Sequence, residues 1–236
     1  MTTAVLFDLG NTLAAYYHAD EFGPILADAI GAVRDELRRR GSCDVPLGAA
    51  LSAALAENRE ASDYRFKPMI ERLERIFGMP LASDSSLATT LCSQFLAPIF
   101  AIGRLYEDAL PALAQLRSAG IRTAIVSNAP WGSPPELWRG ELRRLGLSDA
   151  VDAVVLCGDV GWRKPAPEIF RSAMSRLGCR AADCIFVGDD LRWDIEGSAS
   201  VGMRPLLIDR DGRHAGYMGE RIVNLQALLE LVAAGA

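Results

Sequence analysis

The stretch AVLFDLGNTL, residues 4–13, decides the fold of this chain. Four apolar residues run directly into Asp8, and the turn formers Gly10 and Asn11 follow at once. A short apolar run that ends in turn formers is typical of a strand buried on both faces. Because open parallel sheets place their chemistry at the carboxyl ends of their strands, Asp8 is the first candidate for a functional residue.

From residue 105 onward, strand-like and helix-like stretches alternate. The expected strands are 121–126, 152–156, 184–187 and 205–208, and the expected helices are 107–119, 134–145, a segment ending at Gly178, 192–200 and 224–233. Such alternation indicates a parallel sheet with helices on both faces. The predicted fold class is therefore α/β, with a doubly wound, Rossmann-like parallel sheet.

Between residues 14 and 104 the apolar residues recur at helical spacing, and no convincing strand is expected. A first helix begins near residue 21 and ends in Arg38-Arg39-Arg40-Gly41, since basic residues followed by glycine are typical of a helix C-terminus. Further helices are expected near 47–61, 67–78 and 84–101. This block predicts a helical insertion over residues 16–102, set into an α/β core of residues 1–15 and 103–236.

Composition excludes several classes of protein. The chain has 236 residues, half of them hydrophobic, with a net charge of −5 and no basic stripe of the kind that nucleic acid requires. No apolar stretch approaches the roughly 20 residues that span a bilayer, so no membrane is expected. The five cysteines are odd in number and form no CxxC pair, and no signal peptide is visible, which favours a cytoplasmic protein with reduced thiols. The oligomeric state stays open.

Three later polar residues are expected to join Asp8. Ser127 and Asp189 each follow a predicted strand directly, and Lys164 follows another after a short loop. Each alone has an ordinary explanation as a turn former, helix cap or loop residue. Because all strands of a parallel sheet end at the same edge, the four side chains are expected to converge.

Together these stretches resemble the motifs of the haloacid dehalogenase-like (HAD) hydrolases. The four motifs correspond to residues 7–13, 125–128, 163–170 and 187–190, the last of them extended by Asp194 and Gly197. The resemblance covers about residues 1–13 and 104–236. The helical insertion is similar to the type 1 helical cap of this family.

The resemblance implies a Mg²⁺-dependent phosphohydrolase that acts on a small phosphorylated metabolite. Asp8 would attack phosphorus and form an aspartyl-phosphate, which splits one displacement into two easier steps. Mg²⁺ prefers oxygen ligands, and the family pattern assigns these to Asp8, the carbonyl of Gly10 and Asp189, with Asp190 and Asp194 in support.

The remaining motif residues would handle the phosphoryl group. Ser127 and Asn128 would bind its oxygens, and Lys164 would offset the charge of both nucleophile and phosphoryl group. Thr12 would join the phosphate-binding set or tie down the nucleophile loop, although a hydroxyl there equally serves a turn.

Gly10 departs from the family pattern. Phosphatases of this family usually carry a second aspartate here, which protonates the leaving group and then activates water. Glycine keeps the backbone carbonyl but cannot transfer a proton, and such help is typically worth about 10²–10⁴-fold in rate. His18 is the nearest candidate for a substitute, although a lone histidine is more often structural.

Three interpretations follow from this departure. The protein is a phosphatase, slowed by its missing acid; or a metal-independent 2-haloacid dehalogenase, in which Asp8 attacks carbon; or a weakly active member that binds a ligand or partner. Halide needs no protonation, which suits Gly10, but the acidic pair Asp189-Asp190 would repel an anionic substrate in the absence of a metal.

Specificity is assigned to the insertion and to the segment after the second motif. Cationic residues that could reach a substrate anion are Arg59, Arg65, Lys67 and Arg72, although solvated helix faces are the better explanation for each of them. Trp131 is close enough in sequence to Ser127 to border the site, either stacking on a substrate or covering the core.

Overall fold

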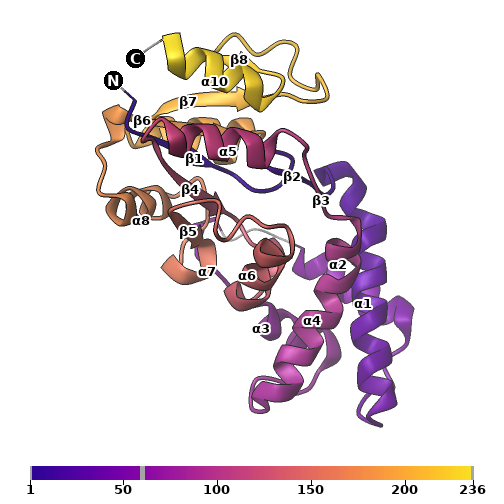
Figure 1. Cartoon of the computed structure of the whole chain (residues 1–236). Coiled ribbons are helices and arrows are strands. Elements are labelled where there is room, and N and C mark those ends of the chain that lie inside the picture. The colour runs from indigo at the N-terminus through magenta and orange to yellow at the C-terminus, as the bar shows by residue number, and fades with distance from the viewer. Residues whose placement is uncertain (1, 59–61, 235–236) are drawn as a thin grey trace.

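A six-stranded parallel sheet forms the centre of the computed structural model, which describes residues 2–58 and 62–234 (Figure 1). In spatial order its strands are β5 (Ala153–Leu156), β4 (Arg122–Ser127), β1 (Ala4–Phe7), β6 (Cys184–Gly188), β7 (Arg204–Ile208) and β8 (Arg221–Ile222). Leu6 of β1 aligns with Ala124 of β4 on one side and with Phe186 of β6 on the other. All four residues of β1 are buried, which explains its uninterrupted apolar sequence.

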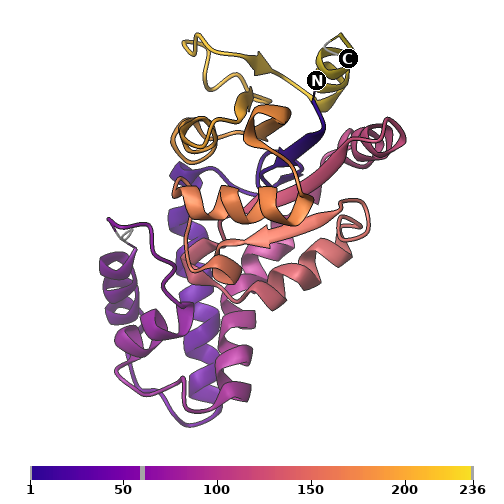
Figure 2. The same cartoon turned by 90° about the vertical axis from the view of Figure 1, so that its left-hand side faces the viewer.

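Helices cover both faces of this sheet, and the predicted α/β class is confirmed. On one face, α5 (Ala109–Ser118) packs against α10 (Leu225–Ala234), whereas α8 (Pro167–Leu177) covers the other face together with α9 (Gly197–Ser200) (Figure 2). The remaining helices of this part are α6 (Pro135–Arg144), α7 (Cys157–Val160), the π-helical turn η4 (Leu191–Glu196) and the 3₁₀ turns η2 (Pro130–Gly132) and η3 (Ala181–Asp183).

The segment between β1 and β4 is mainly helical, as expected. It contains η1 (Ala19–Glu21), α1 (Phe22–Arg39), α2 (Leu47–Glu57), α3 (Met69–Phe77) and α4 (Ser85–Ile102). These helices group at one end of the sheet (Figure 1). Two short strands, β2 (Ala14–Ala15) and β3 (Arg104–Leu105), pair antiparallel where the chain enters and leaves the group. The expectation of no strand from residue 14 was wrong at β2, because two residues are too few to show alternation.

The helix α4 meets the length and composition expected of a membrane span. It has 18 residues with a mean hydropathy of 1.4, and 28% of that window is buried. Helices in the cores of globular proteins meet the same criteria, and α4 packs against α1 and buries Leu91, Phe95 and Ile99. Within residues 2–58 and 62–234, α4 is the single helix that qualifies.

A third connection joins the helical group to the sheet. Residues 64–66, which we call the strap, lie antiparallel to residues 161–163 just before Lys164. Two main-chain hydrogen bonds of 2.9 and 3.0 Å hold these segments together. The guanidinium group of Arg65 lies 3.8 Å from the centroid of the Trp162 ring.

Candidate active site

Asp8 lies at the middle of the sheet edge. It follows β1 directly, and its backbone N–H donates to the carbonyl oxygen of Val187 at 2.9 Å. The neighbouring strands deliver Ser127, the last residue of β4, and Asp189, the first residue after β6. Lys164 lies with them, so the four side chains that were expected to converge all line one cavity.

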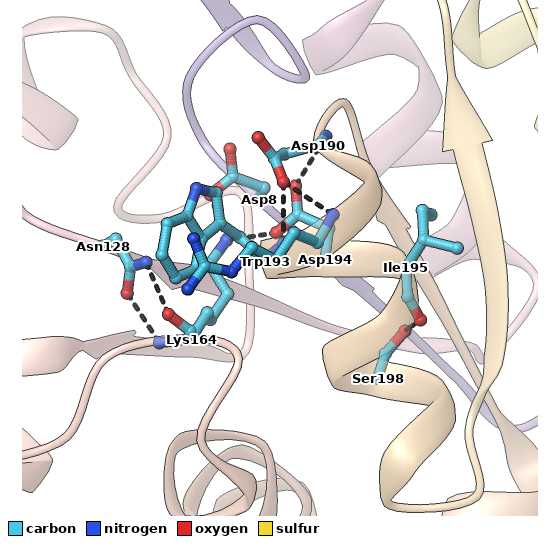
Figure 3. Close-up of polar contacts among 9 residues, drawn as sticks. Asp8, Asn128, Lys164, Asp190, Trp193, Asp194, Ile195 and Ser198 are labelled. Atoms are coloured by element: carbon cyan, nitrogen blue, oxygen red, sulfur yellow. Dashed lines mark hydrogen bonds and ion pairs between the residues drawn. The ribbon is translucent and has the colours of Figure 1, made fainter. Parts of the chain in front are cut away.

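Lys164 joins two carboxylates inside the protein. Its ammonium nitrogen lies 2.5 Å from Oδ1 of Asp8 and 2.6 Å from Oδ1 of Asp194, and its side chain is 2% exposed (Figure 3). Burial by itself lowers the pKa of this ammonium group, but Asp194 and Asp8 reverse the effect and leave the pKa above its usual range. Lys164 is therefore a fixed cation beside Asp8.

Asn128 holds the backbone of Lys164 in place. Its side-chain oxygen accepts from the Lys164 N–H at 2.8 Å, and its side-chain nitrogen donates to the Lys164 carbonyl at 3.2 Å (Figure 3). Both ends of the Asn128 amide are thus bonded to the backbone of Lys164. The predicted contact of Asn128 with a phosphoryl group stays a prediction.

The turn η4 positions the carboxylate of Asp194 next to the ammonium group of Lys164. Asp190 accepts from the backbone N–H groups of Arg192 at 2.8 Å and Trp193 at 2.7 Å, which caps the turn, and its own N–H donates to Oδ2 of Asp194 at 3.1 Å. Gly188 permits the approach, since a Cβ there would lie 2.4 Å from the Asp194 carboxylate. The sequence predicted an ordinary helix over 192–200, whereas the structure has a π-helical turn, a form that is frequent at functional sites.

Three carboxylates are concentrated at this edge. Oxygen atoms of Asp8, Asp189 and Asp194 all lie within 4.8 Å of one another. Burial raises the pKa of Asp189 well above its usual range, and the charges of Asp8 and Asp194 raise it further. Burial also raises the pKa of Asp194 to about 7, against the pull of Lys164.

This cluster fits a divalent cation. Three acidic groups share one buried ammonium group, so a cation with oxygen ligands would relieve their mutual repulsion. Gly10, whose carbonyl was expected to be a ligand, lines the same cavity. Asp194, expected in a supporting position, belongs to the cluster itself.

Gly10 leaves open space beside the nucleophile candidate. A Cβ at this position would lie 4.0 Å from Oδ2 of Asp8 and 4.0 Å from the Tyr16 ring. The backbone there therefore accommodates a side chain, and the absence of a carboxylate reflects the sequence and not a steric requirement.

Thr12 and His18, the two other candidates near Asp8, differ in position. Thr12 is fully buried and is not among the residues that line the cavity, and its hydroxyl has no hydrogen-bond partner within the described part of the chain. The structure thus does not bring Thr12 to the phosphate-binding position. His18 does line the cavity, with Nε2 3.1 Å from Asp211 and Nδ1 3.4 Å from the side-chain nitrogen of Asn11.

The cavity extends from the sheet edge towards the helical group. Its volume is about 920 Å³, and aromatic residues on its wall include Tyr17, Trp131, Trp138 and Trp193. Arg72 also lines it and is 7% exposed, so the solvated-face explanation was wrong for this residue. Arg65 and Lys67 are exposed and lie outside the cavity, and Arg59 lies outside the described residues.

Arg163 and Asn58 line the cavity as well and were not singled out from the sequence. The adjacency of Arg163 to Lys164 was the available signal for the first. Asn58 gave no signal, because helix packing alone brings it to the wall.

Comparison with known proteins identifies the family. Residues 2–202 match the family described as haloacid dehalogenase-like hydrolase. A protein of Halopiger xanaduensis named ribulose-1,5-bisphosphate 5-phosphatase is 32% identical over 219 residues, which cover 89% of this chain and 85% of that protein.

Solved structures extend the similarity to the whole chain. A HAD phosphatase from Thermococcus onnurineus has a TM-score of 0.70 at 27% identity over 98% of each chain. A 2-haloacid dehalogenase from Pseudomonas syringae pv. Tomato DC3000 has a TM-score of 0.70 at 25% identity over 100% of each chain. The chain belongs to the HAD-like hydrolases and is an enzyme. Because these two structures are equally similar to it, the fold does not discriminate between their reactions.

Proposed function

We propose that the protein is a magnesium-dependent phosphatase that acts on a small phosphorylated metabolite through Asp8. The observation that carries the proposal is the cluster of Asp8, Asp189 and Asp194 around one buried lysine. A relative that shares 32% identity over most of its length is also named a phosphatase. We further propose that residues 16–102 act as a cap on the core domain of residues 1–15 and 103–236.

Asp8 would be the nucleophile. Its carboxylate oxygen would form a bond to phosphorus while the bond from phosphorus to the substrate oxygen breaks, and water would then hydrolyse the aspartyl-phosphate to release inorganic phosphate. Magnesium, held by Asp8, the Gly10 carbonyl and Asp189 with Asp190 and Asp194 beside them, would offset the negative charge on the phosphoryl group.

Lys164 and Ser127 would position and neutralise the reacting groups. The ammonium group holds Oδ1 of Asp8, which fixes the carboxylate and leaves Oδ2 for attack. Lys164 keeps its charge throughout, because its pKa lies above the usual range. Ser127, which lines the cavity and is 7% exposed, would hydrogen-bond a phosphoryl oxygen.

The missing acid limits the range of substrates. With Gly10 in place, the leaving oxygen receives no proton from the residue that usually supplies it. Esters with good leaving groups, and acyl phosphates, should therefore be hydrolysed faster than alkyl phosphates.

Dehalogenation is the second candidate, because Gly10 and the equally similar dehalogenase structure both permit it. The carboxylate cluster opposes it. A 2-haloacid is an anion, and a metal-free site with three carboxylates would repel it.

The test is a hydrolysis screen with p-nitrophenyl phosphate, acetyl phosphate and alkyl phosphates, with magnesium and with EDTA. We expect magnesium-dependent phosphate release that Asp8→Asn abolishes. A parallel panel of 2-haloacids serves as the comparison. Halide release in EDTA would establish the dehalogenase instead, and no turnover of either panel would favour a binding protein.

A further inference from the structure

The guanidinium groups of Arg72 and Arg163 both line the cavity. Lys164 and Arg213 line it too, and Arg213 pairs with Asp20 at 3.2 Å. Arg72 comes from α3 in the helical group, and Arg163 comes from the core loop that carries Lys164. The cavity thus receives positive charge from both parts of the molecule.

Arg72 is held in a fixed position. Its guanidinium carbon lies 5.4 Å from the centroid of the Trp131 ring, and the group donates to the backbone carbonyl of Glu57. The carboxylate of Glu57 is engaged by Arg75 in a bidentate pair at 2.8 and 2.9 Å. These contacts orient the side chain at the cavity wall.

Arg163 supplies the second group. Its guanidinium carbon lies over the Trp193 ring, 5.7 Å from the ring centroid. Within the described residues Arg163 forms no ion pair with a carboxylate. Its Nε is buried and has no hydrogen-bond partner in the same part of the chain. A buried donor without a partner is unfavourable, and an oxygen atom of a ligand would satisfy it.

The two groups are close enough to repel. Burial lowers the pKa of Arg72, and the positive charge of Arg163 lowers it further. An anion between two guanidinium groups would replace this repulsion by charge-assisted hydrogen bonds, for which the planar guanidinium group is well suited.

We propose that Arg163 and Arg72 form a second anion subsite, which binds a phosphate or carboxylate at a distance from the phosphoryl group that Asp8 attacks. The inference rests on the proposed function and narrows it. The substrate would be a small metabolite with two anionic groups, and a cavity of about 920 Å³ has room for one.

Three matched esters test the subsite: pentane-1,5-diol bisphosphate, 5-(phosphonooxy)pentanoate and 5-hydroxypentyl phosphate. We expect the wild type to favour one or both of the first two over the third by roughly 10- to 100-fold in kcat/KM. Arg163→Gln should reduce this ratio at least tenfold. The two doubly anionic esters distinguish a phosphate from a carboxylate as the second group.

Arg171→Gln, an exposed arginine on α8 outside the cavity, is the matched control and should keep the wild-type ratio. Equal kcat/KM for all three esters, or a ratio that survives both Arg163→Gln and Arg72→Gln, would overturn the subsite. If no ester is hydrolysed, the proposed phosphatase activity fails on its own. Calorimetric titration of Asp8→Asn with the three compounds then decides the subsite by the same ratio of affinities.

Discussion

Gly10 lies beside Asp8, and among the described residues the space for a larger side chain there is open. The nearest atoms to a Cβ there are 4.0 Å away, in Asp8 and Tyr16. Under the proposed function, Gly10 would keep the backbone carbonyl as a magnesium ligand while lacking a group that transfers a proton.

Gly10→Asp should raise turnover of alkyl phosphates by about 10–10³-fold, since general acid–base catalysis typically contributes about 10²–10⁴-fold. Steady-state kinetics with 5-hydroxypentyl phosphate measure this. Gly10→Asn, of the same shape but unable to transfer a proton, is the control and should show no increase. Equal rates for both variants would mean that another group already supplies the proton.

Lys164→Met should lower the free energy of unfolding by about 3–5 kcal/mol, because it leaves the buried carboxylates of Asp8 and Asp194 without their cation. Urea unfolding in EDTA measures the loss. Adding Asp194→Asn to Lys164→Met should recover part of it. A single variant as stable as the wild type would show that the pair contributes nothing to folding.

At the scale of elements, β6 and η4 meet at Gly188. This residue ends the strand and allows the turn to fold back so that Asp194 reaches Lys164. A Cβ at position 188 would overlap the Asp194 carboxylate. The junction between β6 and η4 therefore requires glycine at position 188.

Gly188→Ala should lower stability by about 1–3 kcal/mol, the usual cost of overpacking, and should weaken magnesium activation by displacing Asp194. Thermal unfolding and a magnesium titration of activity measure the two effects. The control is Gly31→Ala in α1, where a Cβ would meet none of the described residues within 4 Å. This variant should be more stable than the wild type by about 0.5–1 kcal/mol. If both variants were equally stable, the close approach at Gly188 would be unimportant.

Long elements and motif positions were predictable from the sequence. The buried strand β1 and the end of α8 at Gly178 could be predicted because their sequence patterns span several residues. The approach of Asp8 and Lys164 at one sheet edge could be predicted in the same way. Two-residue strands such as β2 show no pattern, and a π-helical turn has the same composition as an α-helical one. The inward position of Arg72 depends on how α3 packs against the core, which local sequence does not encode.

At the scale of the whole molecule, Arg210 links segments that are far apart in the sequence. It pairs with Asp108 at the start of α5 at 2.9 and 3.0 Å, and donates to the carbonyl oxygen of Thr12 in the first motif at 2.9 Å. Asp108 also accepts from the N–H of Leu225 at 2.9 Å, which ties in the start of α10.

This link predicts a pH dependence of stability. Burial raises the pKa of Asp108, but hydrogen bonds from Arg210 and Leu225 outweigh it and leave the pKa below its usual range. The stabilisation is therefore complete above the unfolded value of about 3.9 and is lost as pH falls towards the folded value. The difference in unfolding free energy between wild type and Asp108→Asn should shrink from pH 6 to pH 3. A constant difference would assign the effect to packing alone.

The strap has a mechanical consequence. Residues 64–66 are hydrogen-bonded to residues 161–163, and the next residue in the chain is Lys164. A movement that carries the strap away with the helical group would either break these main-chain bonds or pull directly on the backbone that holds the Lys164 ammonium group against Asp8. Uncovering the cavity and loosening the ion pair between Lys164 and Asp8 would then occur together, so the position of the helical group would control the geometry of the site.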